Sequence, residues 1–509
     1  MSTSVNPATY GGWQSERSGF MGNLSGAGFV LVAAASVIAL IPIYIRSWAS
    51  ALIALPLAVV FLLLAYGRVL GLTADQWIVL AVRHQIAVAK TRNLFLSGVF
   101  APKREDGHQP MDLPGALARL RILEASDGLG GKIGITHNPI DGTYTAVCRV
   151  TFPGLALIDT ERQNMRVKAW AAYLRSQCKE DGAITRISVH QRSLPDDGAA
   201  LRNWTERHTS ADAPAAAVEA LNDLMTSAGP AATIRETFLS VTLSSSRARL
   251  AIKGAGGGQI GAAAVLVREL GAMHSALSSA GLQIAEWLGP RGVAQAIRTA
   301  YDPESQLALA ASNAAAQDAQ WEGVEAGVDP ELAGPAATET GWGVYRHDGA
   351  WTVSYQVRGF PQSEVYATFL QPLLKPRQNA RRSLSLVYEP IGPAKARQEL
   401  AREKTKREAA RGLRAKTGRS ESEDERREAA TARAQDVARA SGHGVLRLTG
   451  LVAVTVTHLD QLETACAELQ ADASSAGLVL RRIWGAQDDA FASSALPLGL
   501  GLPDRRVGI

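Results

Sequence analysis

The clearest pattern in the chain is a pair of uncharged apolar runs near its N-terminus. Gly26–Ile45 and Trp48–Tyr66 contain no Asp, Glu, Lys or Arg, and Arg46 and Ser47 stand between them. Each run has about twenty residues, enough as a helix to cross a hydrocarbon core of roughly 30 Å. The pattern predicts a two-helix transmembrane hairpin over residues 26–66, preceded by a disordered N-terminus over residues 1–25.

Basic residues around the hairpin predict its orientation. Arg46 is the one basic residue between the runs, and six follow the second run: Arg68, Arg83, Lys90, Arg92, Lys103 and Arg104. Because Lys and Arg collect on the cytoplasmic side, we expect a multi-pass protein of the inner (plasma) membrane with the bulk of the chain cytoplasmic. A cleaved signal peptide fits poorly because the second run follows at once, and two buried core helices are the remaining alternative.

After the hairpin, the spacing of apolar positions alternates between helical and strand-like. Residues 67–114 hold a predicted juxtamembrane helix from Thr73 to about Arg92, with Trp77 near the membrane surface, and then a linker. Residues 115–309 follow as a first cytoplasmic α+β domain. Its predicted strands are Tyr144–Val150, Ile184–His190 and Thr237–Leu243, and its predicted helices are Asp159–Gln177, Ala213–Thr226 and Gly261–Ala280.

The strand pattern recurs once. Asp141–Gly142 precedes the strand at 144–150, and Asp348–Gly349 precedes a strand-like stretch at Trp351–Val357. Each leads through a helix-like segment to a second strand, at 187–190 or at Ser383–Tyr388. We therefore predict α/β layers with weakly repeated βαβ units. Residues 310–340, rich in Ala, Gly, Asp and Glu, are expected to be a linker, and residues 341–509 a second cytoplasmic α+β domain.

Charge patterning marks residues 393–442 as a separate segment. They are mostly Ala, Arg, Lys, Glu and Gln, which predicts a charged helical insert projecting from the body. Such an arm could contact DNA phosphates, but its interleaved acidic residues and its lack of aromatic residues favour a partner protein. The candidate partner-binding residues are Arg402, Lys404, Arg407, Glu421, Glu423 and Glu425.

Composition adds two limits. The chain has 509 residues, of which 46% are hydrophobic, so sizeable cores can form, and its net charge of +5 suits an anionic membrane surface as well as nucleic acid. The three cysteines, Cys148, Cys178 and Cys466, lie far apart and show no metal-binding spacing. An odd, sparse set of this kind is typical of a reducing cytoplasm and predicts neither a disulfide framework nor a metal site.

One glycine motif has the spacing of a nucleotide loop. Gly256, Gly258 and Gly261 form G-x-G-x-x-G after a strand-like stretch and before a helix, where backbone N–H groups could approach phosphate. The glycine string can equally be a flexible connection, and no convincing second strand with an acidic residue follows. This loop, Gly254–Gly261, supports a weak alternative, a nucleotide-binding membrane enzyme.

Other catalytic motifs are absent from the sequence. The Gly131–Lys132 pair is followed by Ile133, so it lacks the hydroxyl residue of a P-loop, and neither H-E-x-x-H nor G-x-S-x-G occurs. The histidines beside predicted strand edges are expected to satisfy local hydrogen bonds: His137, His190, His347 and His458. We expect no catalytic residue, metal or cofactor, and hence a protein that is not an enzyme.

The order of these segments resembles a known pair of families. The two runs and the stretch Leu72-Thr73-Ala74-Asp75-Gln76-Trp77 resemble the PrgI-type inner-membrane subunit of type IV secretion (conjugation) systems. The rest resembles the N-terminal, pre-ATPase region of conjugative ATPases, above all in its ending, Gln487, Ala490–Phe491 and Ala495-Leu496-Pro497-Leu498-Gly499. In that family a similar run comes just before the nucleotide-binding core, which is missing here. The resemblance implies a scaffold for an ATPase on another chain, with other inner-membrane subunits as partners and a homo-oligomer within the complex.

A second family shares the layout. The E-component of actinobacterial type VII secretion systems also has two N-terminal spans and a cytosolic α+β domain, and the Ala/Arg/Gly-rich composition fits a high-GC actinobacterium. We favour the type IV interpretation because of the charged helical insert and the Leu-Pro-Leu-Gly ending.

Overall fold

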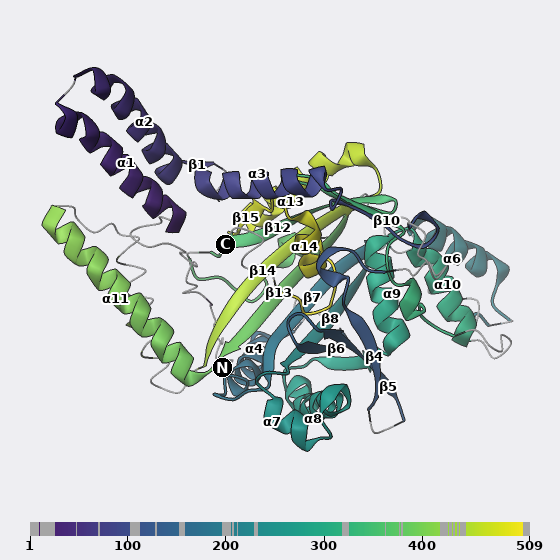
Figure 1. Cartoon of the computed structure of the whole chain (residues 1–509). Coiled ribbons are helices and arrows are strands. Elements are labelled where there is room, and N and C mark those ends of the chain that lie inside the picture. Colours follow the sequence, from purple (N-terminus) through teal and green to yellow (C-terminus); the bar gives the residue numbers. More distant parts are fainter. Residues whose placement is uncertain are drawn as a thin grey trace, which may run out of the picture.

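The computed structural model places a helical hairpin beside a body built on one large sheet (Figure 1). It describes residues 10, 26–46, 48–69, 72–101, 112–127, 130–151, 158–195, 205, 208–210, 212–228, 233–317, 325–361, 363–375, 377, 380–417, 426, 430, 433–434, 437 and 444–501. Apart from Tyr10, the predicted disorder of residues 1–25 therefore lies outside the described residues.

The two apolar runs form α1 (Gly26–Ile45) and α2 (Trp48–Tyr66), with the bounds that the sequence predicts. The helices contact each other, and the residues they bury are small: Ala35, Ala54 and Ala58 are at most 7% exposed. Large apolar side chains point outward; Leu52 and Ile53 are 79% and 75% exposed. Small residues inside and large apolar residues outside are the arrangement of helices that pack within lipid.

By length and composition, α2 could cross a membrane, and α1 carries a shorter described apolar stretch, Gly28–Pro42. The same criterion selects α8 (Gly258–Ser279). However, α8 buries Val265, Leu266 and Leu270 against the sheet, so it is a core helix of the body.

A short segment joins the hairpin to the body. It consists of β1 (Arg68–Val69), β2 (Leu72–Thr73), α3 (Ala74–Ala89), β3 (Leu94–Leu96) and η1 (Gly98–Phe100). Thr73 is the N-cap of α3, and its backbone N–H donates to the side-chain oxygen of Gln76 at 3.2 Å. The predicted helix start at Thr73 is thus confirmed, and α3 lies along one side of the body in Figure 1.

The body has two halves. The first contains η2 (Gly115–Leu117), β4 (Arg121–Ser126), β5 (Lys132–Asn138), β6 (Thr143–Thr151), α4 (Thr160–Ser176), β7 (Ile184–Pro195), α6 (Ala215–Ala228), β8 (Thr233–Ser244), α7 (Arg249–Gly254), α8, β9 (Gln283–Trp287), α9 (Pro290–Tyr301) and α10 (Ser305–Gln317). The predicted strands and helices of residues 115–309 are all present, with ends shifted by a few residues.

The second half follows from residue 330. It contains η4 (Pro330–Leu332), β10 (Ala337–Thr340), β11 (Tyr345–His347), β12 (Ala350–Gly359), η5 (Gln371–Leu374), β13 (Arg381–Ile391), α11 (Pro393–Thr417), β14 (Val445–Val456), η6 (Leu459–Gln461), α13 (Leu462–Ser475), β15 (Val479–Arg482) and α14 (Gln487–Ser494). Within residues 310–340, expected as a linker, β10 is a sheet strand that pairs with β3 and β11.

In the described part of the chain, the thirteen strands of the body belong to one sheet, in the order β3-β10-β11-β12-β14-β13-β7-β8-β6-β5-β4. Strand β15 pairs with β12 and β9 with β6, and each of these pairings is antiparallel. In the first half, β8 lies between β6 and β7, which therefore run parallel to each other across one intervening strand. Strands joined through a helix are thus not neighbours, so the predicted βαβ units take the split form, in which a third strand lies between the two.

The two halves follow the same strand order. Strand β6 pairs with β8 on one side and with β5 and β9 on the other, and β12 pairs in the same way with β14, β11 and β15. The orders β9-β6-β8-β7 and β15-β12-β14-β13 are both that of a ferredoxin-like βαββαβ unit. The main difference is that the helix α4 of the first half corresponds to the single turn η5 in the second.

The halves join edge to edge through β7 and β13. Ile187 pairs with Tyr388, and His190 pairs with Ser385. The sheet therefore continues across the two predicted domains. One face packs on α4, α8 and α13, and the other on α9 and α14, which gives the body a core on each side of the sheet.

Candidate functional site

The predicted glycine loop is a turn between two helices. Gly256 and Gly258 have positive φ angles of 103° and 58°, and the N–H of Gly257 donates to the carbonyl of Ile252 at 2.8 Å. A Cβ on Gly261 would lie 2.4 Å from that same carbonyl oxygen. The glycines are therefore explained by the α7–α8 turn, in which left-handed backbone and close approach both require them. The expected strand before the loop is wrong, because α7 stands there, so the strand–loop–helix context of a dinucleotide site is not formed.

The charged insert begins as α11, which projects from the body in Figure 1. Arg402 and Lys404 are exposed on it. Arg407 lies in α11, but its side chain is outside the described part, as are Glu421, Glu423 and Glu425 entirely.

The base of α11 is held on the body. Ala396 is 2% exposed, and the N–H of Ala394 donates to the carboxylate of Glu180 at 2.8 Å. A guanidinium nitrogen of Arg447 lies 3.6 Å from the carboxylate of Glu399. The arm is thus fixed over its first turns and exposed beyond them.

The histidines of the sheet fill structural roles. His137 stacks on Tyr144, with ring centroids 4.4 Å apart. His347 donates from Nδ1 to the carbonyl of Tyr301 and accepts at Nε2 from the hydroxyl of Thr352, and burial lowers its pKa to about 4. Among the described residues, no group of three or more His, Cys, Asp or Glu side chains could hold a metal ion.

The expectation that His190 satisfies a local hydrogen bond is wrong, because its ring is fully buried in the centre of the sheet and neither ring nitrogen has a hydrogen-bond partner. Burial, and then the neighbouring charge of Arg192, lower its pKa to about 3. The imidazole is therefore neutral at neutral pH.

The roles of a buried arginine on β7 and a half-buried one on β13 were not predicted from sequence. Arg192 donates to the carboxylate of Glu236 at 2.7 Å and to the carbonyl of Ala296 at 3.1 Å. Arg381 donates to the carbonyl of Thr299. These guanidinium groups donate to carbonyls in the C-terminal half of α9, which fixes that helix on the seam between the halves. Burial opposes ionisation of Glu236, yet Arg192 and Arg149 keep its pKa below the ordinary value.

The Leu-Pro-Leu-Gly run lies across the sheet. The hydroxyl of Ser240 donates to the carbonyl of Pro497 at 2.6 Å, and the hydroxyl of Ser383 donates to the carbonyl of Ser494. Gly499 has a φ angle of 64°, and a Cβ there would lie 2.8 Å from the hydroxyl of Thr242. The run therefore leaves α14 in the second half and is buried on the strands of the first.

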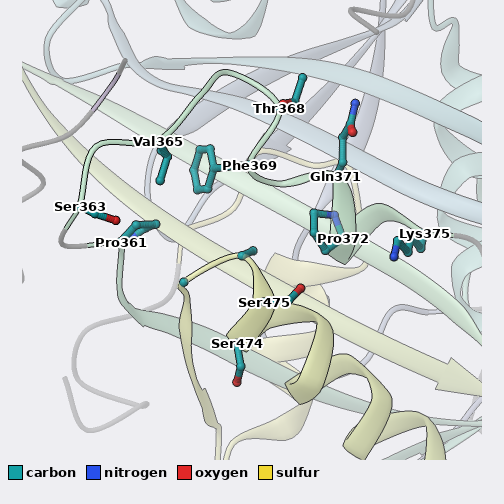
Figure 2. Close-up of a pocket in the computed structure, with 12 residues that line it drawn as sticks. Pro361, Ser363, Val365, Thr368, Phe369, Gln371, Pro372, Lys375, Ser474 and Ser475 are labelled. Carbon is teal, nitrogen blue, oxygen red and sulfur yellow. The ribbon is translucent and has the colours of Figure 1, made fainter. Parts of the chain in front are cut away.

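A groove opens where η5 replaces a full helix. It has a volume of about 480 Å³. Figure 2 shows Val365 and Phe369 on its loop side and Ser474 and Ser475 at the end of α13 on the other. Tyr10 forms an isolated antiparallel bridge with Val365, through two backbone hydrogen bonds of 2.8 Å. Among the described residues that line the groove, Lys375 is the one ionisable side chain, and the groove offers a surface for binding.

A cluster of aromatic rings fixes α3 to the body. We call this cluster the tryptophan junction. It consists of Trp77 on α3 together with Trp342 and Trp484. The ring centroid of Trp77 lies 5.7 Å from that of Trp342 and 5.9 Å from that of Trp484. Trp77 thus faces the body, where two rings far along the chain contact it; its expected place near the membrane surface stays a prediction.

Neighbouring contacts strengthen the junction. The His84 ring lies 5.3 Å from Trp342, edge to face, and Leu80 is 3% exposed. Arg482 lies over the Trp484 ring at 5.0 Å. Trp77, Leu80 and His84 are spaced at three and four residues, so they share one face of α3.

Sheet pairing forms the second attachment. Leu94, Phe95 and Leu96 of β3 pair with β10. The N–H of Thr340 donates to the carbonyl of Asn93 at 2.8 Å, and the N–H of Ser97 to that of Ala336 at 2.9 Å. Two attachments on successive elements hold the segment after the hairpin in one orientation on the body, so the hairpin is joined to a fixed platform.

Comparison with known proteins finds no matching protein-family model and no matching curated protein.

Proposed function

We propose that this chain is a membrane-anchored structural component of a bacterial secretion or conjugation machine, and that it supports an ATPase encoded on a separate chain. The observation that carries the proposal is the exposed apolar hairpin, joined to the body by the tryptophan junction and by the β3–β10 pairing. An anchor that has to transmit a defined position to a cytoplasmic assembly needs such a rigid joint, whereas a simple tether does not.

The proposed topology places both ends of the hairpin in the cytoplasm. The six basic residues between Tyr66 and Pro114 support it, against Arg46 alone between the helices. The proposed location is the inner membrane, with the sheet on the cytoplasmic side.

The proposed partners are the ATPase, other inner-membrane subunits and further copies of this chain. Exposed charges on α11, such as Arg402 and Lys404, support a docking role for the arm. The resemblance of the Gln487–Gly499 region to the segment before a conjugative ATPase core supports the choice of partner. We do not propose direct DNA contact.

We also propose that the weak repeat of the sequence reflects duplication of one βαββαβ unit. The support is the identical strand order of the two halves and two equivalent contacts after β9 and β15: Leu288 N–H donates to the carbonyl of Val147, and Ile483 N–H donates to that of Ser354. The Asp-Gly turns at 141–142 and 348–349 open β6 and β12 at equivalent places.

The alternatives differ in their support. A nucleotide-binding enzyme would need the Gly254–Gly261 loop in a strand–loop–helix context, and the turn lies between two helices instead. The type VII E-component shares the hairpin and the α+β body, so the identity of the ATPase that co-purifies decides between the two secretion systems.

Cysteine labelling from outside intact cells tests the proposal. The native cysteines are at most 9% exposed, so an introduced thiol is the main target. A membrane-impermeant reagent should modify Ser47→Cys, between the helices, and should not modify Ser126→Cys on β4. Labelling of Ser126→Cys alone would reverse the topology, and labelling of neither variant, with the chain found in the soluble fraction, would remove the anchor and the proposal with it.

A further inference from the structure

Helix α3 carries a second apolar stripe on the side opposite the tryptophan junction. Ile78, Val79, Val82 and Ile86 are 51%, 52%, 52% and 48% exposed. Their spacing places them on one face of the helix. The face with Trp77, Leu80 and His84 is already packed on the body. The outward stripe therefore has no role in the folding of the body.

Exposed apolar side chains continue beyond α3. Leu94 and Leu96 on β3 are 51% and 49% exposed, and Phe100 at the end of η1 is 61% exposed. Leu94 and Leu96 lie two residues apart, so they share one face of β3. Exposed apolar groups of this kind mark an interaction site.

The start of α3 is fixed beside the end of α2. Strands β1 and β2 pair so that Arg68 lies opposite Thr73, and the N–H of Gly67 donates to the carbonyl of Leu63 at 2.7 Å. If α2 crosses a membrane, α3 therefore begins at the surface of that membrane and stays close to the membrane.

We infer that α3 lies in the interfacial zone of the bilayer, with Ile78, Val79, Val82 and Ile86 inserted among the lipid headgroups and upper acyl chains. This inference rests on the proposed membrane anchor. The occupant is lipid rather than protein because the stripe continues an apolar surface that begins in the hairpin. Exposed basic residues also lie at its edge and beyond its end, where anionic headgroups would meet them: Arg83, Lys90 and Arg92.

The contact sets the orientation of the whole body. Helix α3 is fixed through Trp77 on one face and held by lipid on the other, so the edge strand β3 lies on the membrane side of the sheet. Figure 1 shows α7 and α8 on the side of the body away from α3, whereas α11 projects on the same side as the hairpin.

Depth-dependent quenching in vesicles tests the inference with the full chain. A fluorophore is attached to Val82→Cys and, in separate proteins, to Leu55→Cys in α2 and to Ile260→Cys on α8, where the native side chain is 81% exposed. The proteins are reconstituted in phosphatidylcholine–phosphatidylglycerol vesicles that contain nitroxide lipids. An interfacial helix inserts about 5–10 Å, so a nitroxide near the headgroup should quench the Val82 label at least about twice as strongly as the Ile260 label. The Leu55 label should respond most to a nitroxide deep in the acyl chains.

The outcomes separate this inference from the proposed function. Quenching at Leu55 without quenching at Val82 would overturn the interfacial helix and leave the anchor in place; a protein partner on the stripe would then be the occupant. No quenching at either position would remove the anchor itself. Should Val82→Cys fail to fold, Ile86→Cys, one turn further along the same stripe, gives the same measurement.

Discussion

The indole of Trp77 on α3 stacks at a tilt against that of Trp342 in the loop before β11, with 5.7 Å between ring centroids and 35° between ring planes. The two residues are far apart in sequence. Trp77 follows the hairpin, and Trp342 lies between two strands of the second half. Their contact is the point at which the juxtamembrane helix becomes part of the body.

Replacing Trp77 with alanine should loosen α3 without unfolding the sheet. Loss of a large, half-buried ring from such a cluster costs about 2–3 kcal/mol, below the range of a fully buried tryptophan. Hydrogen exchange of the purified chain in detergent should show faster exchange in α3 and unchanged exchange in β12 and β14.

Ile78→Ala, on the opposite face of α3, is the matched control and should leave exchange unchanged in detergent. Equal protection of α3 in the Trp77 variant and the control would show that the junction contributes no stability. Faster exchange throughout β12 and β14 would mean instead that α3 is part of the cooperative core.

Gly261→Ala should strongly destabilise the first half. The added Cβ would lie 2.4 Å from the carbonyl oxygen of Ile252, so α7 must move away from α8, at a cost of about 2–3 kcal/mol. Gly271→Ala in the same helix has open space around the new methyl group and should be neutral or slightly stabilising.

The same glycines should have no role in nucleotide binding. Gly256→Ala, at a φ angle of 103°, should lower the melting temperature while a titration with ATP shows no micromolar binding to either the variant or the parent chain. Specific ATP binding by the parent that this change abolishes would contradict the scaffold proposal and favour the enzyme alternative.

Acid should destabilise the body through His347 and His190. Their pKa values in the folded protein, about 4 and about 3, lie below the unfolded value, so between roughly pH 4 and 6.5 the unfolded chain binds protons that the folded chain does not. The stability that each histidine contributes is therefore present above about pH 6.5 and is lost as pH falls. On this basis, proton binding to His347 in the unfolded chain should by itself lower the free energy of unfolding by about 2 kcal/mol as the pH falls from 7 to 5.

Two variants distinguish the histidines at neutral pH. His190→Leu should be neutral or stabilising by about 1 kcal/mol, because the ring nitrogens it removes have no partners. His347→Leu should be destabilising by about 2 kcal/mol, because it leaves the Tyr301 carbonyl and the Thr352 hydroxyl short of a partner. Both should reduce the loss of stability on acidification in denaturant titrations, and an unchanged pH dependence in both would show that the buried rings are not its source.

Deleting residues 402–441 should leave the body folded. Ile391 and Val445 are paired at the base of the arm, so a short Gly/Ser bridge can close the gap, and the deletion keeps Ala396 and Glu399. Since exposed charged helix buries little apolar area, the melting temperature should change by less than about 2 °C.

The same deletion should abolish co-purification of the proposed partner ATPase. As a milder change, Arg402→Glu with Lys404→Glu should weaken that association while the melt stays unchanged, because interface charges act on specificity more than on folding. A deletion protein that still binds the ATPase and supports transfer would show the arm to be a dispensable spacer.

Much of the fold was predictable because local pattern decides it. The uncharged runs give α1 and α2, the capping pattern at Thr73 gives α3, and two-residue alternation gives β6, β7, β8, β12 and β13. These signals depend on residues close together in sequence. The glycine motif shows the limit, since G-x-G-x-x-G suits a phosphate loop and a tight helix–helix turn equally until α7 is known to precede it.

The features that unite the molecule depend on residues far apart in sequence. Pairing of His190 with Ser385 joins the halves, and β3 finds its partner β10 across the whole first half. Register between such strands follows from packing on both faces of the sheet, which no local pattern encodes. The contacts of Trp77 were missed for the same reason, because Trp342 and Trp484 could not be placed beside it from sequence.

The pairing of Leu96 with Ala337 has a consequence for biogenesis. The ribosome makes the hairpin first, so on the proposed function α1 and α2 reach the bilayer long before β10 has been translated. Strand β3 must then wait, unpaired, until about two hundred and forty further residues have emerged. The sheet is thus completed on an anchor already in place, and the body is expected to acquire its final edge at the membrane rather than before arriving there.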